Sequence, residues 1–165
     1  MSEITFRETI YPSDVKYIQN ILESAANFSS EEITIAISLA EERIIKGDKS
    51  GYYFLFAQHS GEIIGYTCFG PIPGTLRSFD LYWIAIHKRF CRFGIGKRLL
   101  SKTESLIAGM GGRRIYIETS SRSSYKAARQ FYSYCEYKEE ALLKNFYAPG
   151  DDKIIYHKEI QSDCC

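Results

Sequence analysis

The segment from Phe79 to Thr119 constrains the fold most, because it reads as a strand, a helix and a second strand. The first stretch, "FDLYWIAIH", is rich in aromatic and β-branched residues, which favour strands. Apolar residues then recur at helical spacing from Ile95 until "GMGG", where the glycines end the helical pattern. A helix joining two strands of one sheet is typical of a right-handed crossover between parallel strands. The segment therefore predicts one parallel strand pair.

The remaining patterns predict antiparallel pairs and three further helices. The stretch "YYFLFAQ", the turn "HSG" and the stretch "IIGYTCFG" indicate a hairpin, and two more strands flank "APGDD" near the end of the chain. Ser29 and Glu32 form a capping-box pattern that starts a helix ending at Gly47. We expect Ser13 or Asp14 to cap the helix before it, and Ser120 or Ser121 to lie near the cap of the last helix.

The predicted element order is β-α-α-β-β-β-α-β-α-β-β. It corresponds to the mixed α/β class, with a mostly antiparallel sheet, one parallel pair and about four helices. We expect residues 1–161 to form a single domain and residues 162–165 a short tail.

Composition narrows the class of protein. The 165 residues carry a formal net charge of +1, which argues against nucleic-acid binding through a broad cationic surface. No stretch has the apolar length of a membrane span, and "MSEITFRETI" lacks a signal-peptide apolar region. The five cysteines show no C-x-x-C spacing, which favours the reducing cytoplasm over a disulfide framework or a metal site.

A local cationic segment stands out against this near-neutral background. Between His87 and Arg98 the chain carries five Lys or Arg residues and no acidic residue, around Gly94 and Gly96. A glycine turn that leads from a strand into a helix is an anion site, because the first helical N–H groups lack partners and glycine admits close approach. The alternative is that the glycines only shape the turn and the cations are solvated. The residue spacing fits neither a P-loop nor a dinucleotide-binding fingerprint.

The segment Cys91–Gly96 resembles the pyrophosphate loop of the GNAT acyltransferases, written [QR]-x-x-G-x-[GA]. The resemblance covers essentially the whole chain, since "KAARQFY" is similar to the A-x-x-x-Y helix of that family and the last hairpin matches its closing hairpin. The chain departs from the family where Cys91 replaces Gln or Arg, where Arg92 replaces a frequent Gly, and where Tyr125 replaces a frequent Asn. "Glu136-Tyr137" also stands where the family usually has "GF".

The resemblance implies an acetyl-CoA site. Backbone donors at the start of the third helix would hold the pyrophosphate, an N–H of Ile84 or Ile86 would polarise the thioester oxygen, and the last helix would complete the site. The residues expected to bind cofactor are Ile84, Ala85, Ile86, Arg92, Phe93, Gly94, Ile95, Gly96, Lys97, Arg98, Tyr125 and Ala128.

Acetyl transfer to an amine needs a proton acceptor for the ammonium and a proton donor for the departing thiolate. The resemblance assigns the donor to Tyr132, four residues after Ala128; a plain core tyrosine is the alternative. Asp80, at the start of one predicted strand, and Glu118, at the end of the next, are candidates for the base. Alternatively, both carboxylates are solvated at strand ends or paired in salt bridges. His87 would either assist phosphate binding or cap a strand, and we expect His59 and His157 at the surface.

We therefore predict a cytoplasmic N-acetyltransferase that moves acetyl from acetyl-CoA to a primary amine by direct attack in a ternary complex. A small-molecule or amino-acid amine is favoured. The alternatives are a protein N-terminal or lysine amine as acceptor, or a non-catalytic acyl-CoA sensor. No metal, nucleic acid or membrane is expected as a partner, and a homodimer remains open.

Overall fold

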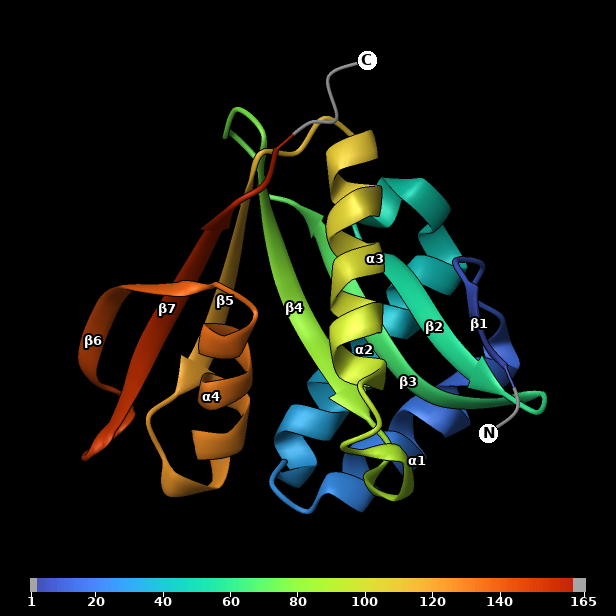
Figure 1. The fold of residues 1–165 in the computed structure, drawn as a ribbon, viewed down its shortest axis with the longest axis horizontal. Helices are drawn as coiled ribbons and strands as arrows, with labels where there is room; N and C mark the ends of the chain where they lie inside the picture. The colour runs from blue at the N-terminus through green and yellow to red at the C-terminus, as the bar shows by residue number, and fades with distance from the viewer. Residues whose placement is uncertain (1–2, 162–165) are drawn as a thin grey trace. The chain divides into compact units, whose positions relative to one another are not determined.

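The protein is described by a computed structural model over residues 3–161, so the expected tail at 162–165 lies outside the described residues. Seven strands follow the order β1-β2-β3-β4-β5-β7-β6 in one mixed sheet, and the β4–β5 pair is parallel (Figure 1). The predicted element order and fold class are confirmed. The elements are β1 (Ile4–Arg7), α1 (Val15–Ala25), α2 (Ser30–Lys46), β2 (Tyr53–His59), β3 (Glu62–Pro71), β4 (Ser78–Ile86), α3 (Ile95–Gly109), β5 (Arg114–Ser120), α4 (Lys126–Tyr134), β6 (Lys138–Ala148) and β7 (Asp151–Glu159).

The chain divides into two compact units. Unit 1 comprises Met1–Gly70 and Trp83–Ser105, and unit 2 comprises Pro71–Tyr82 and Leu106–Cys165. The strand β4 contributes its first half to unit 2 and its second half to unit 1. None of the helices in the described range combines the length and the hydropathy that a bilayer crossing needs.

Unit 1 is layered around its strands. Side chains of α1 and α2, among them Ile18, Leu22 and Ala40, form one core with Phe54 and Phe56 of β2. On the other side of the sheet, α3 packs through Leu99, Leu100 and Thr103, all of which are buried. In Figure 1, α3 crosses in front of the strands of this unit and α2 lies behind them.

Local sequence signals account for the ends of α2, and Asp14, one of the two predicted cap residues, is the N-cap residue of α1. The Ser29 hydroxyl accepts the Glu32 N–H, the Glu32 carboxylate accepts the Ser29 N–H, and Gly47 ends the helix at φ +57°, as predicted. Asp14 precedes α1 but makes no side-chain cap bond. Its buried carboxylate instead accepts the Tyr11 N–H at 2.7 Å and pairs with Arg7 at 2.9 Å. A 3₁₀ turn over Pro12–Asp14 causes this difference, since it turns the carboxylate toward β1.

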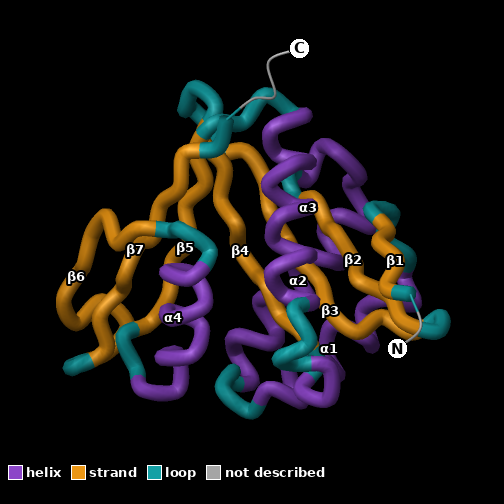
Figure 2. The backbone as a smooth tube through the Cα atoms, in the orientation of Figure 1, coloured by secondary structure: helices purple, strands orange, loops and turns teal. Residues whose placement is uncertain are grey.

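Unit 2 packs α4 on the sheet formed by β5, β7 and β6, and Figure 2 shows β6 as its outer strand. Tyr132 of α4 contacts the rings of Tyr156 and Tyr137. We expected Ser120 or Ser121 near the cap of α4, but a 3₁₀ turn over Ser123–Tyr125 intervenes and the cap residue is Tyr125, so neither serine caps the helix. The two serines join β5 to β7 instead: Ser120 bonds to the Asp151 carboxylate, and the Ser121 hydroxyl accepts the Asp152 N–H.

Candidate active site

A tight turn connects β4 to α3 in unit 1. A 3₁₀ turn over Lys88–Phe90 follows β4, and α3 begins at Ile95, which is buried and anchors the helix start. Between them, Arg92 and Gly94 adopt left-handed backbone conformations, with φ of +68° and +74°. Glycine takes this conformation without strain, whereas an arginine does so at a cost. Arg92, which stands where the family frequently has glycine, therefore adopts a backbone conformation that glycine favours.

Backbone donors gather at this turn. The first hydrogen bond into α3 runs from the Arg98 N–H to the Gly94 carbonyl, at 3.2 Å. Within residues 3–161, the N–H groups of 93–96 have no hydrogen-bond acceptor. A Cβ added at Gly94 would meet no atom within 4 Å, so the backbone there is open to close approach. Together with the helix dipole, these donors form a site suited to an anion such as a pyrophosphate.

Cationic side chains surround the same turn. Arg92 and Lys97 are exposed beside it. The Arg98 guanidinium lies over the ring of Phe6 in β1, 5.5 Å from the ring centroid, and the Lys102 Nζ lies 4.9 Å from the same centroid. Since the Arg98 N–H is already bonded to Gly94, Arg98 can add charge near the turn but no backbone donor.

Cys91 and His87 shape the approach to the turn. The Cys91 Sγ lies 3.7 Å from the carbonyl oxygens of Ile86 and His87, and partial burial raises the pKa of its thiol despite the opposing effect of Arg92. Cys91 is thus a neutral thiol, without the charge that an arginine would bring. The His87 Nδ1 accepts the Arg89 N–H at 3.3 Å, so His87 caps this turn.

The strand that leads to the turn is only briefly paired with β5. The parallel pairing runs from Ser78↔Arg114 to Asp80↔Tyr116, three pairs, although β4 has nine residues and β5 has seven. Gly65 of β3 positions the later part of β4, since a Cβ at Gly65 would lie 2.4 Å from the Ile86 Cδ1. Sequence reasoning missed Gly65; a glycine inside a strand pattern was the available signal.

In unit 2, Tyr132 lies in an aromatic environment on α4. It is buried, with ring centroids of Tyr156 and Tyr137 at 5.7 and 6.4 Å. Burial, with a smaller contribution from Tyr156, raises the pKa of the Tyr132 phenol, so it keeps its proton at neutral pH. Tyr125, at the start of the same helix, is buried beneath the Arg122 guanidinium, and Ala128 is half-buried.

Two carboxylates share one face of the unit 2 sheet. The register Asp80↔Tyr116 places Asp80 on the same face as Tyr116 and Glu118. Burial and the nearby Glu118 raise the pKa of Asp80 to about 6, against a smaller opposing effect of Lys153. Glu118 is more exposed and bonds to Lys153 at 2.8 Å. Lys153 was not among the predicted site residues, because its pairing with β5 depends on the register of β7.

His157 lies on this face as well, and it is not the surface residue that we expected. Its side chain is 19% exposed and its ring stacks on Tyr116 with centroids 4.9 Å apart. Its Nδ1 lies 3.8 Å from a Glu140 carboxylate oxygen, whereas its buried Nε2 has no hydrogen-bond partner among the described residues. The antiparallel pairing Tyr116↔His157 explains the burial, because it sets the two rings opposite each other.

Comparisons with known proteins agree with this arrangement. A model of the acetyltransferase (GNAT) family matches residues 16–137. An Nα-acetyltransferase of Sulfolobus acidocaldarius is 27% identical over 115 residues, which span 64% of this chain and 67% of that protein. A crystal structure from Desulfovibrio desulfuricans, described as a GNAT acetyltransferase, is 37% identical, with a TM-score of 0.94 over 96% of this chain and all of the other.

A more distant structure shares the fold alone. The PaiA N-acetyltransferase of Thermoplasma acidophilum, solved in complex with coenzyme A, is 19% identical, with a TM-score of 0.73 over 96% of this chain and 99% of the other. The family model covers most of the chain, including the turn with its unpaired donors and the helix that carries Tyr132. The chain belongs to the acetyltransferase (GNAT) family.

Proposed function

We propose that this protein transfers the acetyl group of acetyl-CoA to a primary amine, by direct attack of the amine. The row of unpaired N–H groups at residues 93–96, beside an unobstructed Gly94, carries this proposal. Such a row suits a pyrophosphate better than a single carboxylate, because several donors converge at a helix N-terminus. Family membership and the coenzyme A bound to a neighbour of the same fold support it.

Unit 1 would hold the cofactor. The N–H groups of Phe93, Gly94, Ile95 and Gly96 would bind the pyrophosphate, Lys97 would add a donor or a charge, and Arg92 and Arg98 would add charge. Acetyl-CoA, when bound, supplies the acetyl group as a thioester. An N–H of Ile84 or Ile86, with Ala85 between them, would donate to the thioester oxygen, in keeping with the short β4–β5 pairing.

Tyr132 would be the proton donor to the departing thiolate. Its raised pKa keeps the phenol neutral, so it holds a proton whenever it is needed. A thiolate with a pKa near 8.5 is more easily expelled when a positioned acid protonates it. Tyr125, at the start of α4, and Ala128, four residues before Tyr132, would contact the cofactor.

Asp80 is favoured over Glu118 as the base. A general base works best with a pKa near the operating pH, and burial together with Glu118 brings the pKa of Asp80 to about 6. Glu118 is engaged by Lys153 at 2.8 Å, which leaves it a less available proton acceptor. We infer that Glu118 keeps the pKa of Asp80 high and that Asp80 accepts the proton of the amine, directly or through a water.

The acceptor is proposed to be a small-molecule or amino-acid amine, because the carboxylates of Asp80 and Glu118 would attract a compact ammonium group. A protein N-terminus is the second candidate, supported by the similarity to the Nα-acetyltransferase of Sulfolobus acidocaldarius. We propose a cytoplasmic site of action, in line with Cys68, Cys91 and Cys135, which are free thiols in the described chain.

Calorimetry with CoA followed by a thiol-release assay tests the proposal. We expect CoA binding, its loss in Gly96→Glu through bulk and negative charge, and acetyl-CoA-dependent thiol release with one class of a panel of amines and N-terminal peptides. Binding without turnover on every acceptor would favour a sensor. An absence of CoA binding would refute the proposal outright.

We also propose that two copies pair along β6. This edge strand exposes Leu142, Leu143, Phe146 and Tyr147 by between 43% and 53%, and exposed apolar edge strands invite pairing. Bulges on either side leave 141–143 as its regular part. Antiparallel pairing centred on Leu142 would set Glu140 of each copy opposite Lys144 of the other, a self-complementary arrangement.

A charge swap tests this pairing by light scattering after gel filtration. We expect a dimer for the natural chain, a monomer for Lys144→Glu, and a restored dimer for the double variant Glu140→Lys with Lys144→Glu. A monomeric natural chain would exclude the dimer, and an undisturbed dimer in Lys144→Glu would exclude this register.

A further inference from the structure

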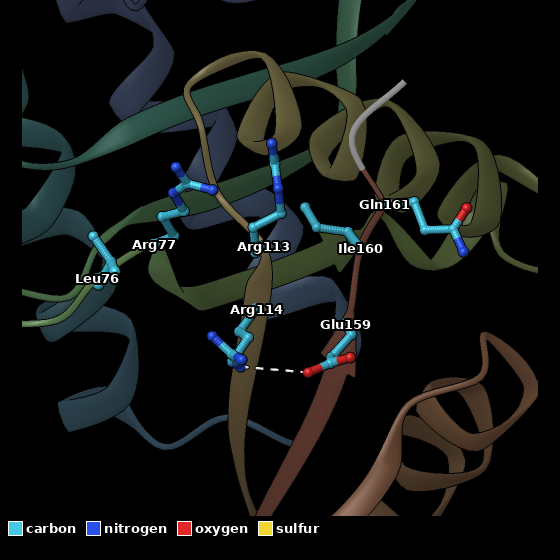
Figure 3. Close-up of a pocket in the computed structure, with 7 residues that line it drawn as sticks. All are labelled: Leu76, Arg77, Arg113, Arg114, Glu159, Ile160 and Gln161. Atoms are coloured by element: carbon cyan, nitrogen blue, oxygen red, sulfur yellow. Dashed lines mark ion pairs between the residues drawn. The ribbon is translucent and has the colours of Figure 1, made fainter. Parts of the chain in front are cut away.

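A hollow of about 450 Å³ lies in unit 2, at the end of the sheet where β4 and β5 begin and β7 ends (Figure 3). It is at the opposite end of β5 from Glu118 and Ser120. Its volume falls within the range of small-molecule sites. Its lining includes Leu76, Arg77, Arg113, Arg114, Glu159 and Ile160.

The hollow carries an excess of positive charge. Its described lining includes three arginines and one carboxylate, and that carboxylate, Glu159, is engaged by Arg114, with the Nε and Oε1 atoms 3.4 Å apart. The Arg113 Nη1 donates to the Gly112 carbonyl at 2.7 Å, which leaves its other N–H groups available. In the described range of the chain, no carboxylate pairs with Arg77 or Arg113.

The backbone holds the two unpaired arginines together. Arg77 adopts a left-handed conformation, with φ of +69°, and its carbonyl accepts the N–H groups of both Arg113 and Arg114, at 2.9 and 3.2 Å. The Ile160 N–H donates to the Arg113 carbonyl at 2.9 Å, which ties in the end of β7. Strained conformations of non-glycine residues persist where several contacts enforce them, and they cluster at binding sites.

The side chains are disposed on two sides of this frame. Figure 3 shows Arg77 and Arg113 extending to the same side from neighbouring segments, with Ile160 beside Arg113, whereas Arg114 turns toward Glu159. Leu76 is 81% exposed at the rim. Two guanidinium groups therefore lie beside apolar side chains, an arrangement suited to a charged head and a short apolar part of one ligand.

We propose that this hollow is a binding site for a small phosphate monoester. Arg77 and Arg113 bind the phosphate oxygens, and Leu76 and Ile160 contact the organic part. A guanidinium matches phosphate geometry through paired N–H groups. A phosphate monoester carries close to two negative charges at neutral pH, which balances the charges of Arg77 and Arg113, neither of which pairs with a carboxylate within residues 3–161. This proposal does not rest on acetyl-CoA binding at residues 93–96.

Nuclear magnetic resonance of the natural chain tests the site, because the shifted amides show whether phosphate binds in this hollow or at residues 93–96. Glycerol 3-phosphate is titrated at constant ionic strength, with inorganic phosphate as the second probe. We expect saturable shifts of the amides of 76–78, 112–114 and 159–161. Arg77→Gln and Arg113→Gln should each weaken binding about tenfold or more, as loss of a charged hydrogen-bonding group does.

Three further variants separate binding from folding. Arg114→Gln should weaken binding less, because Arg114 is already paired, and Glu159→Gln should tighten binding about threefold or more by removing a carboxylate of the lining. Lys138→Gln, an exposed cation of β6, is the matched control and should change nothing. The proposal would be overturned if the shifts fail to saturate. It would also be overturned if Glu159→Gln and Arg77→Gln both bind with the affinity of the natural chain.

Discussion

Thr67 of β3 and Thr103 of α3 bond to each other through their hydroxyl oxygens, 2.8 Å apart, and both side chains are fully buried. The Thr103 hydroxyl also donates to the Leu99 carbonyl at 2.9 Å, so Thr103 accepts the Thr67 hydroxyl proton. This pair fixes α3 on the sheet of unit 1, and α3 carries the proposed cofactor-binding turn at its start. The Thr67–Thr103 hydrogen bond therefore stabilises the fold and also holds in place the helix that begins at the proposed cofactor-binding turn.

The two threonines are expected to respond unequally to replacement by valine. Thr103→Val leaves the buried Thr67 hydroxyl unpaired and should lower the free energy of unfolding by about 1–3 kcal/mol. Thr67→Val leaves Thr103 bonded to Leu99 and should cost about 1 kcal/mol. The double variant should cost less than the sum, because no orphaned hydroxyl remains. Urea unfolding measures all three, and a larger loss in Thr67→Val would contradict the donor assignment.

Gly94→Ala should weaken CoA binding while lowering stability only modestly. The Cβ would stand where a phosphate approaches the backbone, so we expect about a tenfold loss of affinity or more. The positive φ of +74° adds a cost of about 1 kcal/mol to folding. Gly74→Ala is the matched control, since Gly74 has φ of +76° and equally open surroundings. Calorimetry should show the affinity loss in Gly94→Ala alone; equal affinities would remove Gly94 from the site.

Tyr132→Phe should lower kcat by about 10²–10⁴-fold, the usual contribution of a general acid, and leave the Kd for CoA unchanged. Tyr134→Phe changes an exposed tyrosine of the same helix, 68% exposed, and should keep full activity. The measurement is single-turnover thiol release, which isolates the chemical step. Wild-type turnover in Tyr132→Phe under these conditions would show that Tyr132 is a core residue only.

The pH profile should report Asp80. Since its pKa is about 6, kcat/KM should fall as the pH drops through 6 and protonates the base. Asp80→Asn should lose most activity together with this acid limb. A limb near pH 4 would point to an unperturbed carboxylate instead.

The same raised pKa gives a stability prediction of defined sign. A carboxyl whose folded-state pKa exceeds its unfolded value favours folding when protonated, so the contribution of Asp80 to stability is lost as the pH rises from about 4 to 6. Asp80→Asn removes this penalty and should raise the free energy of unfolding at pH 7 by about 1 kcal/mol relative to the natural chain, after allowance for solvent screening of a half-buried group. Chemical unfolding of both chains at pH 7 and pH 4 measures it; an equal difference between variant and natural chain at the two pH values would contradict the assignment.

Caps, turns and element order were accessible from the sequence because their causes are local. Ser29 and Glu32 lie within one helical turn of each other. The two glycines between Phe93 and Lys97 favour a turn through their own backbone conformations, whatever lies around them in the fold. The partner of the Asp14 carboxylate was not accessible, since Asp14 stands at the predicted cap of α1 but bonds to Arg7 of another element instead of its own helix. The same holds for Ser120, whose partner Asp151 lies 31 residues away.

The sequence by itself determined the order of the elements and the turn with its unpaired donors, because hydrophobic period, glycine conformation and helix ends depend on neighbours along the chain. Only the tertiary structure decided that the pKa of Asp80 is raised, that His157 is covered, and that Arg77 and Arg113 share a hollow. These outcomes depend on strand register and burial, which bring together residues such as Asp80 and Glu118 across two strands. Charge interactions, desolvation and strand pairing involve residues that are distant in the sequence, so local sequence patterns do not predict them.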